Sequence, residues 1–192
     1  MKVFLLDNYD SFTFMLKDYI EQCGAGCVVK RNDDDSINDD NFLDKFDAII
    51  ISPGPKTPKE SGCLMKIIST YHQKKPMLGV CLGHQGIGEF FGAKLVKSKL
   101  PRHGKVDEIH LTNNKLFENT ETKIAVTRYH SLLLEDVKLP LKIIAWSESN
   151  EIMAIAHHHL PIFGIQFHPE SCLTKNGITF IDNFLKISKQ LP

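Results

Sequence analysis

The chain has 192 residues, of which 42% are hydrophobic and 24% are charged, and its counts of Lys+Arg and Asp+Glu are both 23. This balance is typical of a globular domain, so we expect residues 1–192 to form a single domain. The zero net charge excludes a strongly basic nucleic-acid-binding protein, and no apolar run approaches the roughly 20 residues that cross a bilayer. The five scattered cysteines give no disulfide framework, which favours a cytoplasmic location.

The first half of the sequence predicts alternating strands and helices. An apolar strand over residues 3–7 precedes a helix that Asp10 or Ser11 is expected to cap and that ends near Gly24. Further strands are predicted over residues 27–30, 46–51 and 76–80, and further helices over residues 63–74 and from Cys81 to Gly92.

The second half is richer in strands and closes with a helix. Strands are predicted over residues 94–96, 106–111, 124–126, 143–146, 152–156 and 162–167, and the helix over residues 177–189. The early alternation predicts an α/β fold with an open, mostly parallel central sheet flanked by helices. Several of the later strands are expected to be antiparallel additions to that sheet.

The most informative stretch is Gly79-Val80-Cys81-Leu82-Gly83, in which a cysteine stands between two glycines directly after an apolar run. This layout is typical of a nucleophile elbow, a sharp strand-to-helix turn that presents a reactive side chain at the end of a sheet. The glycines avoid crowding in the turn, and the positive end of the following helix favours a thiolate. We therefore predict that Cys81 is a nucleophile, although this stretch alone also fits a tight turn around a buried thiol.

His168 is the best candidate for the base that such a nucleophile needs. It follows the predicted strand over residues 162–167, Pro169 is expected to end that strand, and Glu170 is close enough in sequence to orient the imidazole. Active sites in open α/β sheets gather at the carboxyl ends of strands, so Cys81 and His168 are expected to meet. Taken alone, a His-Pro-Glu segment is more often a surface turn.

Acyl transfer also needs donors for a developing oxyanion. The backbone N–H of Leu82, the residue after the nucleophile, is one candidate, and Gly54 in the proline-rich loop after the strand over residues 46–51 is another. The neighbouring Pro53 and Pro55 have no N–H to offer. The three segments, each directly after a predicted buried strand, together indicate a thiol-dependent acyl transferase.

Other polar clusters are weaker signals. His157-His158-His159 is expected at a strand end or turn rather than at a metal, because adjacent side chains on a strand point to opposite faces. The acidic residues 33–40 are expected in a solvated loop or helix start, and His84 is expected to be a supporting group near Cys81. His103 fits either a partner contact or a simple turn. The sequence predicts no metal and no organic cofactor.

The combination of Gly79-Val80-Cys81-Leu82-Gly83-His84-Gln85, Ser52-Pro53-Gly54-Pro55 and Phe167-His168-Pro169-Glu170-Ser171 resembles the class I (triad-type) glutamine amidotransferases nearly end to end. Asp7-Asn8-Tyr9-Asp10-Ser11-Phe12-Thr13 and Arg128-Tyr129-His130-Ser131-Leu132 are similar to one branch of that family. This branch contains the small glutaminase subunits of anthranilate synthase and aminodeoxychorismate synthase. The resemblance implies a flavodoxin-like fold.

The resemblance also implies a mechanism. Cys81 would attack the side-chain carboxamide of L-glutamine, His168 would shuttle the proton, and Glu170 would orient His168. Ammonia would leave, a γ-glutamyl thioester would form on Cys81, and water would then release glutamate. The residues implied in binding glutamine and its oxyanion are Gly54, Pro55, Lys56, Leu82, Gln85, Ser131 and Leu132. Lys56 stands where the family often has Gly or Cys, so it is expected to alter access to the pocket or a partner contact.

By the same resemblance, the ammonia passes to a larger chorismate-binding synthase subunit in a heterodimer or heterotetramer. Docking of that subunit is expected to complete the oxyanion hole, so the free chain should be nearly inactive. Two alternatives stay open: a stand-alone γ-glutamyl cysteine hydrolase with the same triad, and a catalytically inactive regulatory subunit. Both anthranilate and aminodeoxychorismate stay open as products.

Overall fold

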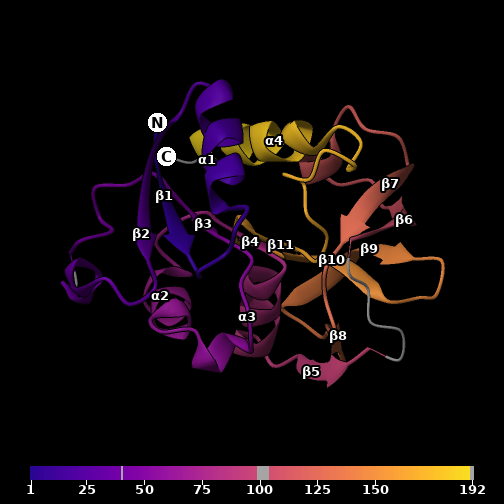
Figure 1. The fold of residues 1–192 in the computed structure, drawn as a ribbon, viewed down its shortest axis with the longest axis horizontal. Helices are drawn as coiled ribbons and strands as arrows, with labels where there is room; N and C mark the ends of the chain where they lie inside the picture. The colour runs from indigo at the N-terminus through magenta and orange to yellow at the C-terminus, as the bar shows by residue number, and fades with distance from the viewer. Residues whose placement is uncertain (40, 99–103, 191–192) are drawn as a thin grey trace.

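The computed structural model describes residues 1–39, 41–98 and 104–190 (Figure 1). In chain order, the strands are Lys2–Asp7 (β1), Gly26–Arg31 (β2), Ala48–Ile51 (β3), Met77–Val80 (β4), Lys94–Lys97 (β5), Lys105–Leu111 (β6), Lys123–Arg128 (β7), Leu132–Glu135 (β8), Leu141–Ser147 (β9), Ile152–His157 (β10) and Ile162–Ile165 (β11). The helices are Thr13–Gln22 (α1), Leu64–Tyr71 (α2), Leu82–Phe90 (α3) and Gly177–Lys189 (α4), with 3₁₀ turns at Asp35–Asn38 (η1), Pro58–Glu60 (η2) and Lys115–Phe117 (η3).

One mixed sheet holds most of these strands, in the order β2-β1-β3-β4-β11-β10-β9-β6-β7. The pairs from β2 through β11 are parallel, whereas β10, β9, β6 and β7 add on as antiparallel strands. The predicted α/β fold, with a parallel core and antiparallel additions, is confirmed. β5 instead pairs with β8, a strand that the sequence pattern did not predict, in a separate two-stranded sheet.

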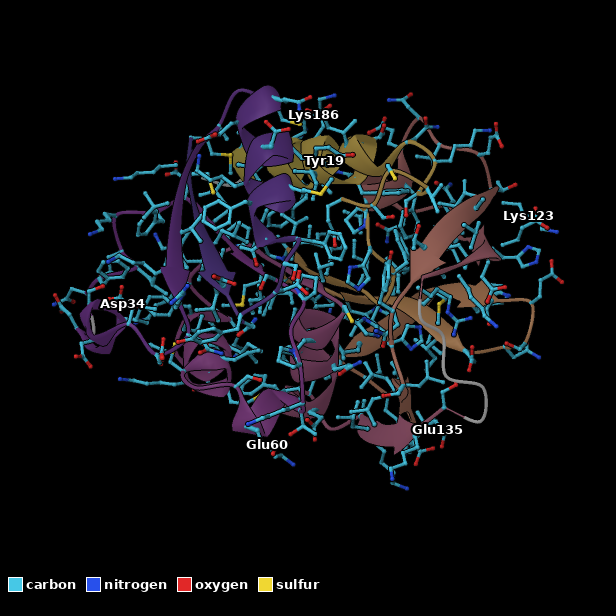
Figure 2. The ribbon with its side chains drawn as sticks, in the orientation of Figure 1. Tyr19, Asp34, Glu60, Lys123, Glu135 and Lys186 are labelled. Carbon is cyan, nitrogen blue, oxygen red and sulfur yellow. The ribbon has the colours of Figure 1, made fainter. Side chains whose placement is uncertain are left out.

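Helices cover both faces of the parallel part of the sheet. α1 and α4 lie together on one face, and α2 and α3 lie together on the other (Figure 1). The side chains of β1 alternate between the two resulting cores, with Val3 and Leu5 in one and Phe4 and Leu6 in the other. Charged side chains such as Asp34, Glu60 and Lys123 lie at the periphery (Figure 2).

The predicted cap of α1 and the predicted end of β11 were wrong. α1 begins at Thr13 with Phe12 at its N-cap and no side-chain cap, and the carboxylate of Asp10 instead accepts from the Phe12 N–H at 2.7 Å. β11 ends at Ile165, so Pro169 does not terminate it. The parallel pairing of β11 ends here because its neighbour β4 turns away at Cys81.

No helix in the described part of the chain is both long enough and apolar enough to cross a membrane. His103 and Asp40, which belong to the weaker signals of the sequence, lie outside the described residues.

Candidate active site

Cys81 forms a strained elbow between β4 and α3. Its φ of 50° is rare for a residue with a side chain and costs of order 1–3 kcal/mol. A Cβ on Gly79 would lie 2.3 Å from the carbonyl carbon of Gly83, and one on Gly83 would lie 2.6 Å from the oxygen of Ile51. The close contact between strand and helix therefore requires glycine on both sides of the cysteine.

The sheet order brings Cys81 and His168 to the same edge. β11 is the parallel neighbour of β4, and the Cys81 N–H donates to the carbonyl of Ile165 at 2.8 Å. Three residues beyond Ile165, the His168 N–H donates to the carbonyl of Thr127 on β7 at 3.0 Å. His168 is thus fixed between the two halves of the sheet.

His168 and Glu170 form a buried pair. Nδ1 of His168 lies 2.5 Å from Oε1 of Glu170, and both side chains are enclosed. Burial alone would lower the pKa of His168, but the Cys81 sulfur and the Glu170 carboxylate outweigh it and raise the pKa well above its usual value. Nε2 of His168 is buried and, within the described residues, has no partner in hydrogen-bond geometry. The ring therefore has one nitrogen engaged and one available near the sulfur.

Two aromatic rings cover this pair. The ring centroids of Tyr129 and Phe12 lie 5.0 and 6.2 Å from that of His168, and the two rings lie 5.7 Å from each other. They come from segments far apart in the sequence and close over the imidazole. This cover helps to keep water away from the His168–Glu170 pair.

A pocket of about 200 Å³ opens beside Cys81, which is itself only 6% exposed. The residues that line it are Gly54, Pro55, Lys56, Cys81, Gln85, Tyr129, His130, Ser131 and Leu132. Six residues predicted to bind substrate are therefore gathered around the sulfur. Leu82 does not line the pocket but begins α3, where the first backbone N–H groups of a helix lack intrahelical partners.

The loop after β3 is held against the elbow by Asn8, a residue whose role the sequence alone did not indicate. The side-chain amide of Asn8 donates to the carbonyl of Ser52 at 3.0 Å, and its backbone N–H donates to the Ser52 hydroxyl at 2.9 Å. A Cβ on Gly54 would lie 2.5 Å from Cβ of Asn8 and 2.8 Å from Cδ2 of Leu82. Glycine at position 54 thus allows the loop to pack directly against α3.

Lys56 in this loop has a φ of 67°. This left-handed conformation costs a residue with a side chain roughly 1 kcal/mol, and glycine adopts it freely. The Lys56 side chain is exposed at the mouth of the pocket. Lys56 therefore lines the pocket in a backbone conformation that favours glycine.

The pocket wall formed by Ser131 and Leu132 depends on Arg128, which is fully buried at the end of β7. Its guanidinium pairs with Asp107 at 2.5 Å and with Glu151, and its Nε donates to Nε2 of His130 at 3.0 Å. Nδ1 of His130 donates in turn to the carbonyl of Leu132 at 3.0 Å. The segment that carries Ser131 and Leu132 is thereby tied to β6 and to the β9–β10 turn.

Gln166 is a second residue that the sequence alone did not indicate. It is fully buried, and its Nε2 donates to Sγ of Cys81 at 3.5 Å. Its position two residues before His168 could have indicated that the two side chains lie on the same side, because alternate residues of an extended segment share a face.

The weaker signals are not part of this constellation. His157 ends β10, its Nδ1 accepts from the backbone of His159 and Leu160, and His158 and His159 are exposed. No set of three or more His, Cys, Asp or Glu residues in the described ranges is arranged to hold a metal ion. All five cysteines are free thiols.

The fold and the site together define an α/β protein with a cysteine, a histidine and a glutamate gathered at the carboxyl ends of neighbouring parallel strands. The family model "Glutamine amidotransferase class-I" matches residues 4–187. The chain therefore belongs to the class I glutamine amidotransferases.

Several curated relatives are similar over nearly the whole chain. Aminodeoxychorismate synthase component 2 of Escherichia coli (strain K12) is 44% identical, over 95% of this chain and 98% of that protein. Anthranilate synthase component 2 of Thermus thermophilus is 42% identical over 97% and 92%, and aminodeoxychorismate/anthranilate synthase component 2 of Bacillus subtilis is 41% identical over 96% and 95%.

A solved structure is also similar. A protein from Thermoplasma acidophilum, described as a GMP synthase subunit, superposes with a TM-score of 0.88 at 27% identity, over 98% of this chain and 94% of that one. Its similarity extends over both the parallel core and the antiparallel strands of the fold.

Proposed function

We propose that this chain is a glutaminase that hydrolyses L-glutamine through Cys81, His168 and Glu170 and supplies the ammonia to a chorismate-aminating synthase subunit. The single observation that supports the catalytic part best is the buried His168–Glu170 pair, whose second ring nitrogen is left available beside the Cys81 sulfur. Glutamine offers the small, polar amide substrate that suits a pocket of about 200 Å³.

In the first half-reaction, the Cys81 thiolate attacks the side-chain carboxamide carbon of glutamine. The carbonyl oxygen becomes an oxyanion, and we assign its stabilisation to the backbone N–H groups of Leu82 and Gly54. Protonated His168 then donates its Nε2 proton to the nitrogen as the C–N bond breaks. Ammonia leaves, and a γ-glutamyl thioester remains on Cys81.

In the second half-reaction, neutral His168 takes a proton from a water molecule that attacks the thioester carbonyl. The C–S bond breaks, glutamate leaves, and the Cys81 thiolate and the protonated imidazole are restored. Glu170 stabilises the positive charge on the ring in both halves and keeps Nε2 directed toward the sulfur.

The remaining pocket residues are assigned to substrate binding. The backbone at Ser131 and Leu132, the side chain of Gln85, and the loop of Gly54, Pro55 and Lys56 surround the sulfur from different elements. Groups that the fold already holds in place orient a polar amino acid at little entropic cost.

Delivery of ammonia to a synthase subunit is supported by two observations. The relatives named above are the second components of anthranilate and aminodeoxychorismate synthases and match this chain over nearly its whole length. In addition, Tyr9, Phe14 and Leu173 are large apolar side chains that are more than half exposed, and they flank site residues in the chain. A contiguous exposed apolar patch marks a docking surface, and we assign these three side chains to the surface that the synthase subunit covers.

The catalytic proposal is tested by ammonia release from L-glutamine and by labelling with an electrophilic diazoketone analogue of glutamine. Cys81→Ala should abolish both, whereas Cys172→Ala, at an exposed thiol, should retain both. Absence of labelling in the complex with the synthase subunit would favour an inactive regulatory subunit. Faster cleavage of γ-glutamyl peptides than of glutamine would favour a stand-alone hydrolase.

The partner proposal is tested by measuring glutamine turnover with and without a chorismate-aminating large subunit. Docking over the mouth of the pocket is expected to raise turnover by at least tenfold, because it would complete the oxyanion site at the strained Gly54–Lys56 loop. Equal rates in the presence and absence of the subunit would reject gating by the partner.

A further inference from the structure

A continuous chain of buried hydrogen bonds, not used in the mechanism above, ends on the nucleophile. It runs from Arg128 through His130, the carbonyl of Leu132, Gln85 and Gln166 to the sulfur of Cys81. Its members come from β7, the segment before β8, β8 itself, helix α3 with its N-cap, and the segment after β11. The chain therefore connects the substrate-binding wall of the pocket to the reactive atom.

The Arg128 end fixes the direction of the first two bonds. A guanidinium can only donate, so Nε of Arg128 donates to Nε2 of His130 at 3.0 Å. Burial and the charge of Arg128 lower the pKa of His130 to about 3, so its ring is neutral and carries its proton on Nδ1. That Nδ1–H donates to the carbonyl of Leu132 at 3.0 Å.

The Leu132 carbonyl fixes the orientation of both glutamines. A carbonyl can only accept, so Gln85 must present its NH₂ group, which donates to Leu132 and also to Oε1 of Gln166, both at 3.2 Å. With its oxygen engaged in this way, Gln166 must direct its own NH₂ group at Sγ of Cys81, 3.5 Å away. The amide cannot reverse without placing its NH₂ group against that of Gln85.

We propose that Gln166 is a further catalytic residue, whose side-chain amide donates a hydrogen bond to the Cys81 sulfur and stabilises the thiolate. The proposal rests on the proposed role of Cys81 as nucleophile. A donor on the charged form of a thiol favours that form, and inside a protein the effect is strong because water does not compete. The Gln166 amide does not ionise, so it donates to the sulfur without taking part in the proton transfers of His168.

His168 and Gln166 differ in whether they transfer a proton during the reaction. His168 must give up its proton to the departing nitrogen, so the positive charge that it holds beside the sulfur is lost during the reaction. Gln166 keeps its proton, so it can hold the sulfur at the strained elbow in the free enzyme and after glutamate leaves. The Gln166 side chain can do this because Gln85, itself bound to the carbonyl of Leu132, donates to its amide oxygen from the other side.

The test is the pH dependence of Cys81 alkylation by iodoacetamide, resolved by peptide mass spectrometry. Gln166→Met removes the donor at similar volume, and Gln166→Glu replaces it with an oxygen that repels the thiolate. Both should raise the midpoint of the alkylation profile by about one pH unit or more. Alkylation of the exposed Cys172, measured in the same samples, shows whether the reactivity of the iodoacetamide itself differs between them.

A matched control separates this role from a loss of stability. Asn183 on α4 is also a buried amide, and its Nδ2 donates to the carbonyls of Leu116 and Glu118. Asn183→Leu should lower the stability of the fold and leave the Cys81 alkylation midpoint unchanged.

The Gln166 variants should in addition lower kcat for glutamine by about 10- to 100-fold with a smaller change in KM.

The outcomes distinguish this inference from the proposed function. If the wild-type complex releases ammonia and is labelled at Cys81, yet folded Gln166→Met keeps the wild-type alkylation midpoint and kcat, the role of Gln166 is rejected alone. If Cys81→Ala retains full glutaminase activity, the proposed function itself is rejected. If Gln166→Glu does not fold, Gln166→Met decides, because it introduces no charge.

Discussion

Glu170 lies 2.5 Å from His168 through Oε1 and Nδ1, two residues apart in the sequence and both enclosed by the protein. Because the carboxylate engages Nδ1, the ring presents Nε2 on its other side, toward the sulfur of Cys81. A buried carboxylate that orients an imidazole also stabilises the cation formed when that imidazole accepts a proton. The pair therefore decides both where His168 points and which charge it carries.

Glu170→Gln should lower kcat for glutamine hydrolysis by roughly 10²- to 10⁴-fold, because a neutral amide neither stabilises the imidazolium nor fixes the tautomer. KM should change little, since Glu170 does not line the pocket. The measurement is steady-state ammonia release from the complex with the synthase subunit. Glu121→Gln, at an exposed carboxylate paired with Lys175, is the control. A kcat within threefold of wild type in Glu170→Gln would contradict an orienting role.

Stability should fall steeply in mild acid because of two other histidines. Burial lowers the pKa of His84 to about 3, and burial together with Arg128 does the same for His130. A depressed pKa means that the unfolded chain binds protons first, so stability is present above about pH 6.5 and is lost as the pH falls. Each histidine should remove roughly 2 kcal/mol between pH 7.5 and pH 5.

Urea unfolding at these two pH values measures this loss. His84→Gln should reduce the difference between the two free energies of unfolding by about half, whereas His158→Gln, at an exposed side chain, should leave it unchanged. A difference between pH 7.5 and pH 5 that is as large in His84→Gln as in the wild type would show that the His84 ring is not held neutral.

The elbow should not accept a methyl group at position 83. In Gly83→Ala, the new Cβ would lie 2.6 Å from the backbone oxygen of Ile51 and 2.8 Å from its Cβ, so β3 and α3 would have to separate. We expect a loss of about 2–3 kcal/mol in unfolding free energy and a displaced Cys81. Gly26→Ala is the matched control, since its nearest neighbour would be 3.9 Å away. Equal stability of the two variants by thermal unfolding would contradict the close contact at the elbow.

The sequence predicted the parallel core well because its signals are local. Apolar runs such as residues 46–51 end in glycine- or proline-containing turns, and helix α4 matches its predicted range. β8 was missed because its residues, Leu132–Glu135, pair with β5 across a distant part of the chain, and no local pattern reports such pairing. The cap of α1 was misassigned because two polar residues precede a helix that begins later.

The candidate site divides in the same way. Cys81, His168 and Gly54 stand in short motifs whose residue types indicate a chemistry, so the sequence alone was enough to propose them. Gln166 and Asn8 were not, because an amide side chain gains meaning only from what it contacts in the fold. Arg128 was noted only within a motif, and its burial beside two carboxylates depends on the packing of β6 and the β9–β10 turn against β7.

The buried charge of Arg128 leads to a final prediction, that it positions the pocket wall that we propose binds glutamine. Arg128→Met would leave Asp107 and Glu151 without the cation and His130 without the donor to Nε2. Removing one partner of a buried ion pair costs about 3 kcal/mol or more. Because Ser131 and Leu132 depend on His130, we also expect KM for glutamine to rise at least tenfold.

Lys123→Met is the matched control on the same strand. Lys123 also bridges two carboxylates, Glu108 and Glu148, but its side chain is 43% exposed, so water screens both pairs. Its loss should leave KM unchanged and stability nearly so. Urea unfolding and glutamine titration of the two variants provide the comparison. If Arg128→Met raised KM no more than Lys123→Met did, the wall would have to be held by the backbone pairing of β7 and β8 with their neighbours, and the ion pairs would serve stability alone.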